Sequence, residues 1–138
     1  MSPLFVYGSL KEGFPNAHVN TGVRRPGRFR TVERLPFYLV GDGWLPCLVH
    51  APGQGEQVIG QVFDVTADAL AAMDLLERVG EPGGYVRLSI RVEPADSETG
   101  PAIDAFVYLQ DPQRLQGDGP RIGPLAEYTL EHARRLAW

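Results

Sequence analysis

The sequence has very few of the residues that form covalent or metal-based links within a fold. It contains one cysteine, Cys47, and three histidines, His18, His50 and His132. A single cysteine cannot form an internal disulfide, which is typical of proteins in a reducing compartment. The histidines are too scattered to match the ligand spacing of a zinc site. We therefore expect a protein without a disulfide, a metal site or a cofactor.

A basic surplus and long apolar segments are also missing. The chain carries 13 Lys and Arg against 17 Asp and Glu, for a net charge of −4, whereas nucleic-acid-binding proteins normally have a strong basic excess. Its first residues lack the basic and apolar regions of a signal peptide. No apolar run approaches the ~18 residues of a membrane helix. The sequence thus predicts a cytoplasmic protein that binds neither nucleic acid nor membrane, and it leaves the oligomeric state open.

What the sequence does contain is typical of one globular domain over residues 1–138. No linker, repeat or low-complexity segment divides it, and its 12 prolines and 16 glycines are spread between short apolar runs. This spread is typical of many short strands joined by turns. We expect strands at residues 3–7, 27–33, 35–40, 44–50, 57–65, 85–93 and 102–110. We expect turns or loops at residues 8–13, 41–43, 96–100 and 117–120.

Two segments are predicted to be helices, at residues 67–79 and 125–136. Thr66 is a suitable N-cap for the first helix, and Gly80 and Pro82 follow its end. About seven strands with two helices do not form a βαβ pattern. We therefore predict an α+β fold with a mostly antiparallel, barrel-like sheet of about six to seven strands and two main helices.

Glu77 is the first candidate for chemistry. At 100° per residue it shares a helical stripe with Leu70 and Met73, so it is expected to point toward the core in the last helical turn. Burial and the negative end of the helix both raise a carboxyl pKa, toward the range useful for general acid/base catalysis. Two alternatives stay open, in which Glu77 reaches water or pairs with an arginine. Asp74 is either a helper or a structural residue.

The second candidate is the turn after the first strand, formed by Tyr7, Gly8, Ser9 and Leu10. Consecutive free N–H groups at a strand end form an anion-binding concavity, and glycine at position 8 permits unusual backbone geometry or a close approach. The alternative is an ordinary strand-to-turn transition. Tyr85 and Tyr108 are expected in the core or in a pocket wall.

A thiol-dependent hydrolase using Cys47 and His50 is a rival hypothesis. Three residues apart on one strand, these side chains would point to opposite faces, which disfavours the pair. Cys47 also lies in an apolar run, where a free cysteine is most often a small buried hydrophobe.

Several short motifs together resemble the γ-glutamylcyclotransferase-like (AIG2-like) family, and most closely its γ-glutamylamine cyclotransferase branch. The motifs are Val-Tyr-Gly-Ser-Leu-Lys at 6–11, Gly-Phe-Pro-Asn at 13–16, Leu-Pro-Cys-Leu at 45–48, Gly-Gln-Val-Phe at 60–63, Met-Asp-Leu-Leu-Glu at 73–77, Tyr-Val-Arg at 85–87 and Phe-Val-Tyr at 106–108. The resemblance covers about residues 4 to 110. Arg78 stands where the family often has glycine, so we expect Gly80 to cap the helix. The segment from Leu125 matches nothing in the family pattern.

The resemblance implies a small-molecule γ-glutamyl substrate whose α-amine attacks its own γ-carbonyl, releasing 5-oxoproline and an amine. It implies that Glu77 transfers the protons and that the backbone of residues 7–10 holds the glutamyl end, without a metal or a cofactor. The identity of the leaving amine stays open. The rival from another class is a non-catalytic small-molecule binding or regulatory module on the same scaffold.

Overall fold

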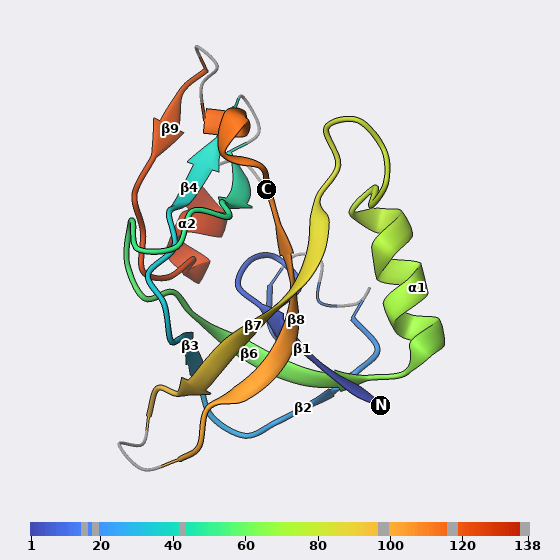
Figure 1. Cartoon of the computed structure of the whole chain (residues 1–138). Coiled ribbons are helices and arrows are strands. Elements are labelled where there is room, and N and C mark those ends of the chain that lie inside the picture. Colours follow the sequence, from blue (N-terminus) through green and yellow to red (C-terminus); the bar gives the residue numbers. More distant parts are fainter. Residues whose placement is uncertain (15–16, 18–19, 42–43, 97–99, 116–118, 136–138) are drawn as a thin grey trace.

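The structure is a computed structural model that describes residues 1–14, 17, 20–41, 44–96, 100–115 and 119–135. Its described part contains nine strands, two α-helices and a short 3-10 helix (Figure 1). In chain order these are β1 (Ser2–Val6), β2 (Val23–Arg24), β3 (Phe29–Thr31), β4 (Phe37–Val40), β5 (Leu45–Leu48), β6 (Ile59–Val65), α1 (Ala67–Leu76), β7 (Val86–Pro94), β8 (Ile103–Leu109), η2 (Pro112–Leu115), β9 (Arg121–Ile122) and α2 (Leu130–Arg135).

Five strands close into a barrel. The strands pair in the order β1-β8-β7-β3-β6, and β6 pairs in turn with β1, while β2 extends the sheet beside β6. Every pair in this sheet is antiparallel except β1 with β8. Closure leaves the barrel strands without free edges, which protects them from pairing with other chains. The predicted α+β fold with a mostly antiparallel, barrel-like sheet is confirmed.

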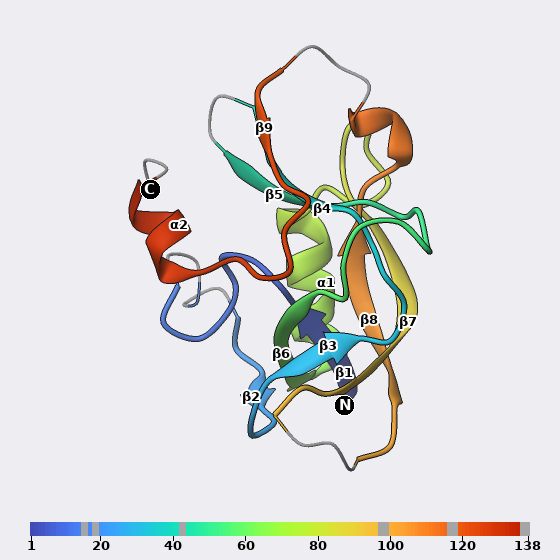
Figure 2. The same ribbon diagram turned by 90° about the vertical axis from the view of Figure 1, so that its left-hand side faces the viewer.

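A second, smaller sheet has the order β5-β4-β9 and lies above the barrel in the views of Figures 1 and 2. The larger hydrophobic cluster joins the two sheets, because it combines Phe5 and Val62 of the barrel with Phe37 and Leu48 of the small sheet. The two-residue strands β2 and β9 were not predicted. Two residues are too few to show the alternating pattern that identifies a strand.

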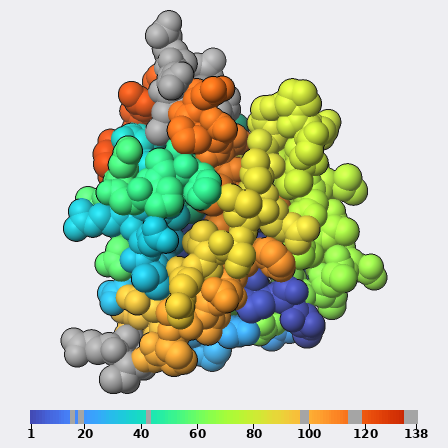
Figure 3. Space-filling model, viewed as in Figure 1, coloured from blue at the N-terminus to red at the C-terminus, as the bar shows by residue number. Residues whose placement is uncertain are grey.

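Helix α1 packs on the outside of the barrel, at the right of Figure 1, and it forms one flank of the space-filling surface beside β7 (Figure 3). The Thr66 side chain caps it by accepting a hydrogen bond from the Ala69 N–H, at 3.1 Å. Its core-facing residues are Leu70 and Met73, which are 8% and 1% exposed and pack with residues of β1 and β6. Two of the three residues of the predicted stripe, Leu70 and Met73, are therefore buried as expected, and Glu77 is half-buried. The helix ends at Leu76, three residues earlier than predicted.

Helix α2 begins five residues later than predicted. The Leu125 N–H donates to the Phe37 carbonyl, and the Ile59 N–H donates to the Ala126 carbonyl, each at 2.7 Å. These bonds hold the segment before α2 against β4 and β6 in an extended conformation, which overrides its helix-forming composition. The helix then starts behind Thr129, whose Oγ1 accepts from the His132 N–H at 3.2 Å.

Some sequence predictions concern residues outside the described ranges. They are parts of the expected connections at 41–43, 96–100 and 117–120, the Pro-Asn pair at 15–16, His18, and the end of the second helix at 136.

Candidate active site

A cavity of about 260 Å³ opens beside the end of β1. Its wall comes from β1 and the turn after it, from β5, from the end of α1, from the start of β7 and from β8. The lining residues are Phe5, Val6, Tyr7, Gly8, Ser9, Leu10, Leu45, Pro46, Leu76, Glu77, Tyr85 and Tyr108. The fold thus brings all five predicted site residues to one cavity, although the helix and the first turn lie about half the chain apart.

Glu77 is the C-cap residue that directly follows α1, and hydrogen bonds fix its backbone on both sides. Its N–H donates to the Met73 carbonyl at 2.9 Å, and its carbonyl accepts from the Tyr85 N–H at 3.0 Å. Burial removes water from the side chain and raises its pKa to about 7. Among the described residues, no side-chain hydrogen bond or ion pair to Glu77 is formed. The carboxyl therefore lacks the arginine partner that the sequence left open.

The backbone behind Glu77 turns through a Schellman motif. The Arg78 N–H donates to the Leu75 carbonyl at 3.2 Å, and the Val79 N–H donates to the Asp74 carbonyl at 3.0 Å. Arg78 occupies the left-handed position of this motif with a φ of 57°, where glycine is the usual residue. The prediction that Gly80 replaces the missing glycine is wrong, because Arg78 itself adopts the strained conformation.

Asp74 lies outside the cavity lining and has a structural role. It forms an ion pair with Arg87 at 3.2 Å and accepts a hydrogen bond from the Tyr108 hydroxyl at 2.8 Å. Burial and the Asp74 carboxylate raise the pKa of Tyr108, and burial raises that of Tyr7. Both phenols therefore stay protonated near neutral pH, which leaves Glu77 as the titrating group of the wall.

The turn after β1 approaches β5 closely at Gly8. A Cβ on residue 8 would lie 3.0 Å from the Cβ of Pro46, which is tighter than ordinary contact. The φ of Gly8 is not in the left-handed region, so close approach explains this glycine and unusual backbone geometry does not. The N–H groups of Gly8 and Leu10 donate to no other described residue. They are available to an anionic group in the cavity.

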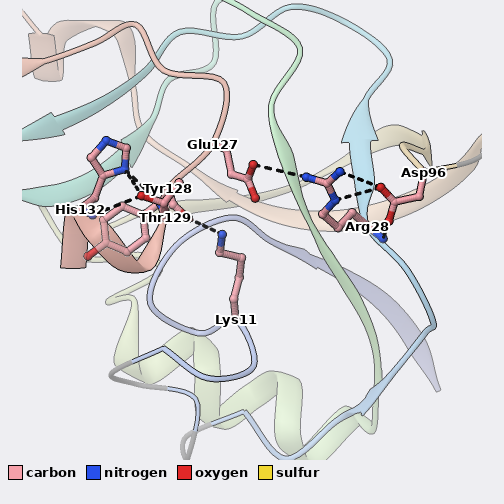
Figure 4. A network of polar contacts seen from close by, with 7 residues as sticks. All are labelled: Lys11, Arg28, Asp96, Glu127, Tyr128, Thr129 and His132. Atoms are coloured by element: carbon pink, nitrogen blue, oxygen red, sulfur yellow. Dashed lines mark hydrogen bonds and ion pairs between the residues drawn. The ribbon is translucent and has the colours of Figure 1, made fainter. Parts of the chain in front are cut away.

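Lys11 anchors this turn to the segment before α2 (Figure 4). Its ammonium donates to the Tyr128 carbonyl and lies 4.2 Å from the centre of the Phe14 ring. Burial lowers the pKa of Lys11 to about 8, and the charge of Glu127 opposes that shift. Arg28 in turn holds Glu127 at 3.6 Å and Asp96 at 2.8 Å. The sequence contained no signal for this network, because its members are far apart in the chain.

The rival pair, Cys47 and His50, is separated by the fold. Cys47 is buried, with 1% of its surface exposed, whereas His50 is exposed and lines a different hollow together with Arg91 and Asp104. Over the described ranges, no three His, Cys, Asp or Glu side chains are grouped as metal ligands. No helix in those ranges is long and apolar enough to cross a membrane.

The fold and the cavity define a β-barrel protein with a small cavity whose described lining contains one carboxyl, the half-buried Glu77. The chain belongs to the family described as gamma-glutamyl cyclotransferase, AIG2-like, whose model matches residues 4–129. The family predicted from the sequence is thereby confirmed, and so is an enzyme of the γ-glutamylcyclotransferase type. The match extends beyond residue 110, where the sequence motifs end.

Known relatives agree with this assignment. The chain is 34% identical over 117 residues to a gamma-glutamylaminecyclotransferase of Rattus norvegicus, covering 78% of this chain and 77% of the relative. It is 35% identical over 123 residues to that of Homo sapiens, covering 78% of each. The crystal structure of an AIG2-like protein from Mus musculus matches with a TM-score of 0.83 and 31% identity. That match covers 100% of this chain and 95% of the mouse chain, including the segment from Leu125 that had no counterpart in the sequence motifs.

Proposed function

We propose that this protein cleaves a γ-glutamyl amide by intramolecular cyclisation and releases 5-oxoproline and a free amine. One observation carries the proposal: an unpaired carboxyl with a pKa of about 7, Glu77, shares a small cavity with the free N–H groups of Gly8 and Leu10. Family membership and relatives named gamma-glutamylaminecyclotransferases support it.

The first step removes a proton from the substrate. The α-ammonium of the glutamyl group gives one proton to the Glu77 carboxylate, and the freed amine nitrogen attacks the γ-carbonyl carbon. A new C–N bond closes the five-membered ring, and the carbonyl π electrons move to its oxygen. N–H groups near residues 8–10 would bind either this oxyanion or the α-carboxylate. The substrate supplies its own nucleophile, so a Ser, Cys or His nucleophile is not required.

The second step returns the proton. Protonated Glu77 donates to the nitrogen of the original amide, the C–N bond to that nitrogen breaks, and the carbonyl re-forms. The ring nitrogen gives up its second proton, which the released amine takes up, so the products are 5-oxoproline and the ammonium form of the amine, and the Glu77 carboxylate is regenerated. A pKa near the working pH suits a group that must act as base and then as acid. Ring closure within one bound molecule carries a large effective molarity when the cavity holds the folded conformer.

A panel of γ-glutamyl amides tests the proposal. Each compound is incubated with the purified protein, and 5-oxoproline and the released amine are measured together, with Glu77→Gln as the control. We expect equal amounts of both products from the parent and almost none from the variant. Binding without release across the panel would favour a non-catalytic binding module and overturn the proposal.

A further inference from the structure

The cavity has a closed inner end and an apolar mouth. Its inner lining includes Phe5, Val6 and Leu10, which are 1%, 3% and 7% exposed. Leu45 and Leu76 line the same cavity, but they are 47% and 48% exposed. They are the two exposed residues of the described lining, so we place them at the opening of the cavity. The mouth is therefore flanked by one leucine from β5 and one from the end of α1.

The tyrosine hydroxyls in the cavity wall donate hydrogen bonds to other groups of the protein. The Tyr7 hydroxyl donates to the Tyr108 carbonyl at 2.6 Å, and the Tyr85 hydroxyl donates to the Pro46 carbonyl at 2.5 Å. The Tyr108 hydroxyl donates to Asp74. Of the described residues that line this cavity, Glu77 is the one whose side chain can carry a charge near neutral pH.

The carboxylates near the end of α1 are compensated as well. Asp74 is paired with Arg87 at 3.2 Å, and Glu81 is paired with Arg78 at 3.7 Å. Among the described residues near the end of α1, a cationic group leaving the mouth would meet two leucines and two carboxylates that already have arginine partners. An ammonium loses hydration at such a surface without gaining a counter-charge, whereas an alkyl chain gains from burial.

This geometry identifies where the leaving amine goes. With the glutamyl end at the turn after β1 and the reacting bond at Glu77, the amine must extend toward the mouth. We infer that Leu45 and Leu76 determine specificity, favouring amines with an uncharged, apolar chain beside the nitrogen over amines with a second positive charge there. The inference rests on the proposed function and refines it by naming the class of amine.

Two isosteric substrates test this directly. γ-Glutamyl n-propylamide and γ-glutamyl 2-aminoethylamide have the same number of non-hydrogen atoms, and they differ in a terminal methyl against a terminal ammonium. We expect kcat/KM at pH 7 to be about tenfold or more higher for the propylamide, which is the size of discrimination that an apolar subsite provides.

A charge at the mouth is expected to change the preference. In Leu76→Glu the ratio should fall toward one or reverse, because the new carboxylate pairs with the ammonium. Leu75→Glu is the matched control, since Leu75 is the neighbouring residue on α1, is 81% exposed and does not line the cavity. Its ratio should equal that of the parent.

The outcomes separate this inference from the function on which it rests. A parental ratio near one, or one that favours the aminoethylamide, overturns the inference while leaving cyclisation intact. Equal ratios in the two glutamate variants overturn the role of Leu76. If the parent cleaves neither compound, the panel of γ-glutamyl amides decides the proposed function, and calorimetric binding of these two intact amides decides the specificity. Tighter binding of the propylamide then supports the apolar mouth, and equal or absent binding overturns it.

Discussion

Glu77 and Lys11 are both ionisable groups removed from water beside the same turn, yet their surroundings are opposite. Burial raises the pKa of Glu77 to about 7, and no described side chain is paired with it. Burial lowers the pKa of Lys11 to about 8, but its ammonium has a carbonyl, an aromatic ring and the charge of Glu127 around it. An unpaired buried charge weakens a fold, whereas a compensated one can hold two segments together. From this difference we propose a chemical role for Glu77 and an anchoring role for Lys11.

The sharpest test of this comparison is Glu77→Gln. Glutamine keeps the size of the side chain, but it cannot accept the proton of the substrate ammonium. General acid/base groups contribute about 10²–10⁴-fold, and because one group serves both steps we expect a loss of about 10³–10⁴-fold. Single-turnover formation of 5-oxoproline measures the loss, and calorimetric binding of 5-oxoproline shows whether the cavity is intact. A variant that retains a tenth of the parental rate would remove Glu77 from the mechanism.

In the turn after β1, we expect activity to be nearly as sensitive to substitution at Gly8 as at Glu77, and to tolerate substitution at Ser9. Gly8→Val places a branched side chain against Pro46, where even a Cβ would be crowded at 3.0 Å. The turn must then shift. A misplacement of about 1 Å near the reacting groups costs about 100-fold in rate, and we expect a loss of that order. Ser9→Ala keeps the backbone N–H groups, so a loss below about tenfold is expected. The measurement is steady-state kcat/KM for both variants. Equal, mild effects would show that this turn only connects two segments and does not bind the substrate.

Glu77 should also affect stability in a pH-dependent way. Its folded-state pKa of about 7 exceeds the ordinary 4.5, so the native state binds more protons than the unfolded state between these values. Stability from this group is therefore full below about pH 4.5, falls as the pH rises to about 7, and is constant above it. The loss is at most about 3 kcal/mol. Urea unfolding at pH 5 and pH 8 should show Glu77→Gln gaining on the parent at the higher pH. A gain at pH 5 only would contradict the sign.

Substitution of Lys11 should lower stability and substrate affinity, whereas substitution of Glu77 should lower the rate. Lys11→Met keeps the apolar stem, but it removes the hydrogen bond that the Lys11 ammonium donates to the Tyr128 carbonyl. A lost buried partner costs about 1–3 kcal/mol, so we expect a lower unfolding midpoint and a KM several-fold higher, with kcat changed less. Lys11→Arg, which keeps the charge, is the matched control. If Lys11→Met had normal stability and KM but a greatly reduced kcat, Lys11 would act in catalysis and would not differ from Glu77 in role.

The sequence predicted which residues come together at one cavity better than it predicted the edges of the fold. The inward position of Glu77 followed from its spacing to Leu70 and Met73, because helical periodicity is a local property. The short strand β9 and the extended segment before α2 depend on partners far away in the chain, such as Phe37 and Ile59. Local patterns cannot report such pairings.

The mouth of the cavity was missed for a related reason. Leu45 and Leu76 are apolar residues on exposed positions, and single exposed leucines are ordinary in soluble proteins. That they line one cavity becomes evident only in the fold, which brings β5 and the end of α1 together. The available signal was two neighbouring leucines at the helix end, Leu75 and Leu76, both outside the stripe formed by Leu70, Met73 and Glu77.

The smallest expected effect concerns the residue behind Glu77. Arg78 adopts a φ of 57°, which costs a non-glycine residue about 1–2 kcal/mol. Arg78→Gly removes that strain, but it adds freedom to the unfolded chain worth about 0.5–1 kcal/mol. The exposed pair with Glu81, at 3.7 Å, contributes little. We therefore expect a net gain of about 0.5–1 kcal/mol in urea unfolding. Because Met73 and Tyr85 fix the Glu77 backbone on both sides, kcat/KM should stay within about twofold. Arg78→Ala, which is also strained at this φ, is the control and should show no gain in the free energy of unfolding. A large fall in kcat for Arg78→Gly would mean that strain at Arg78 positions the Glu77 carboxyl.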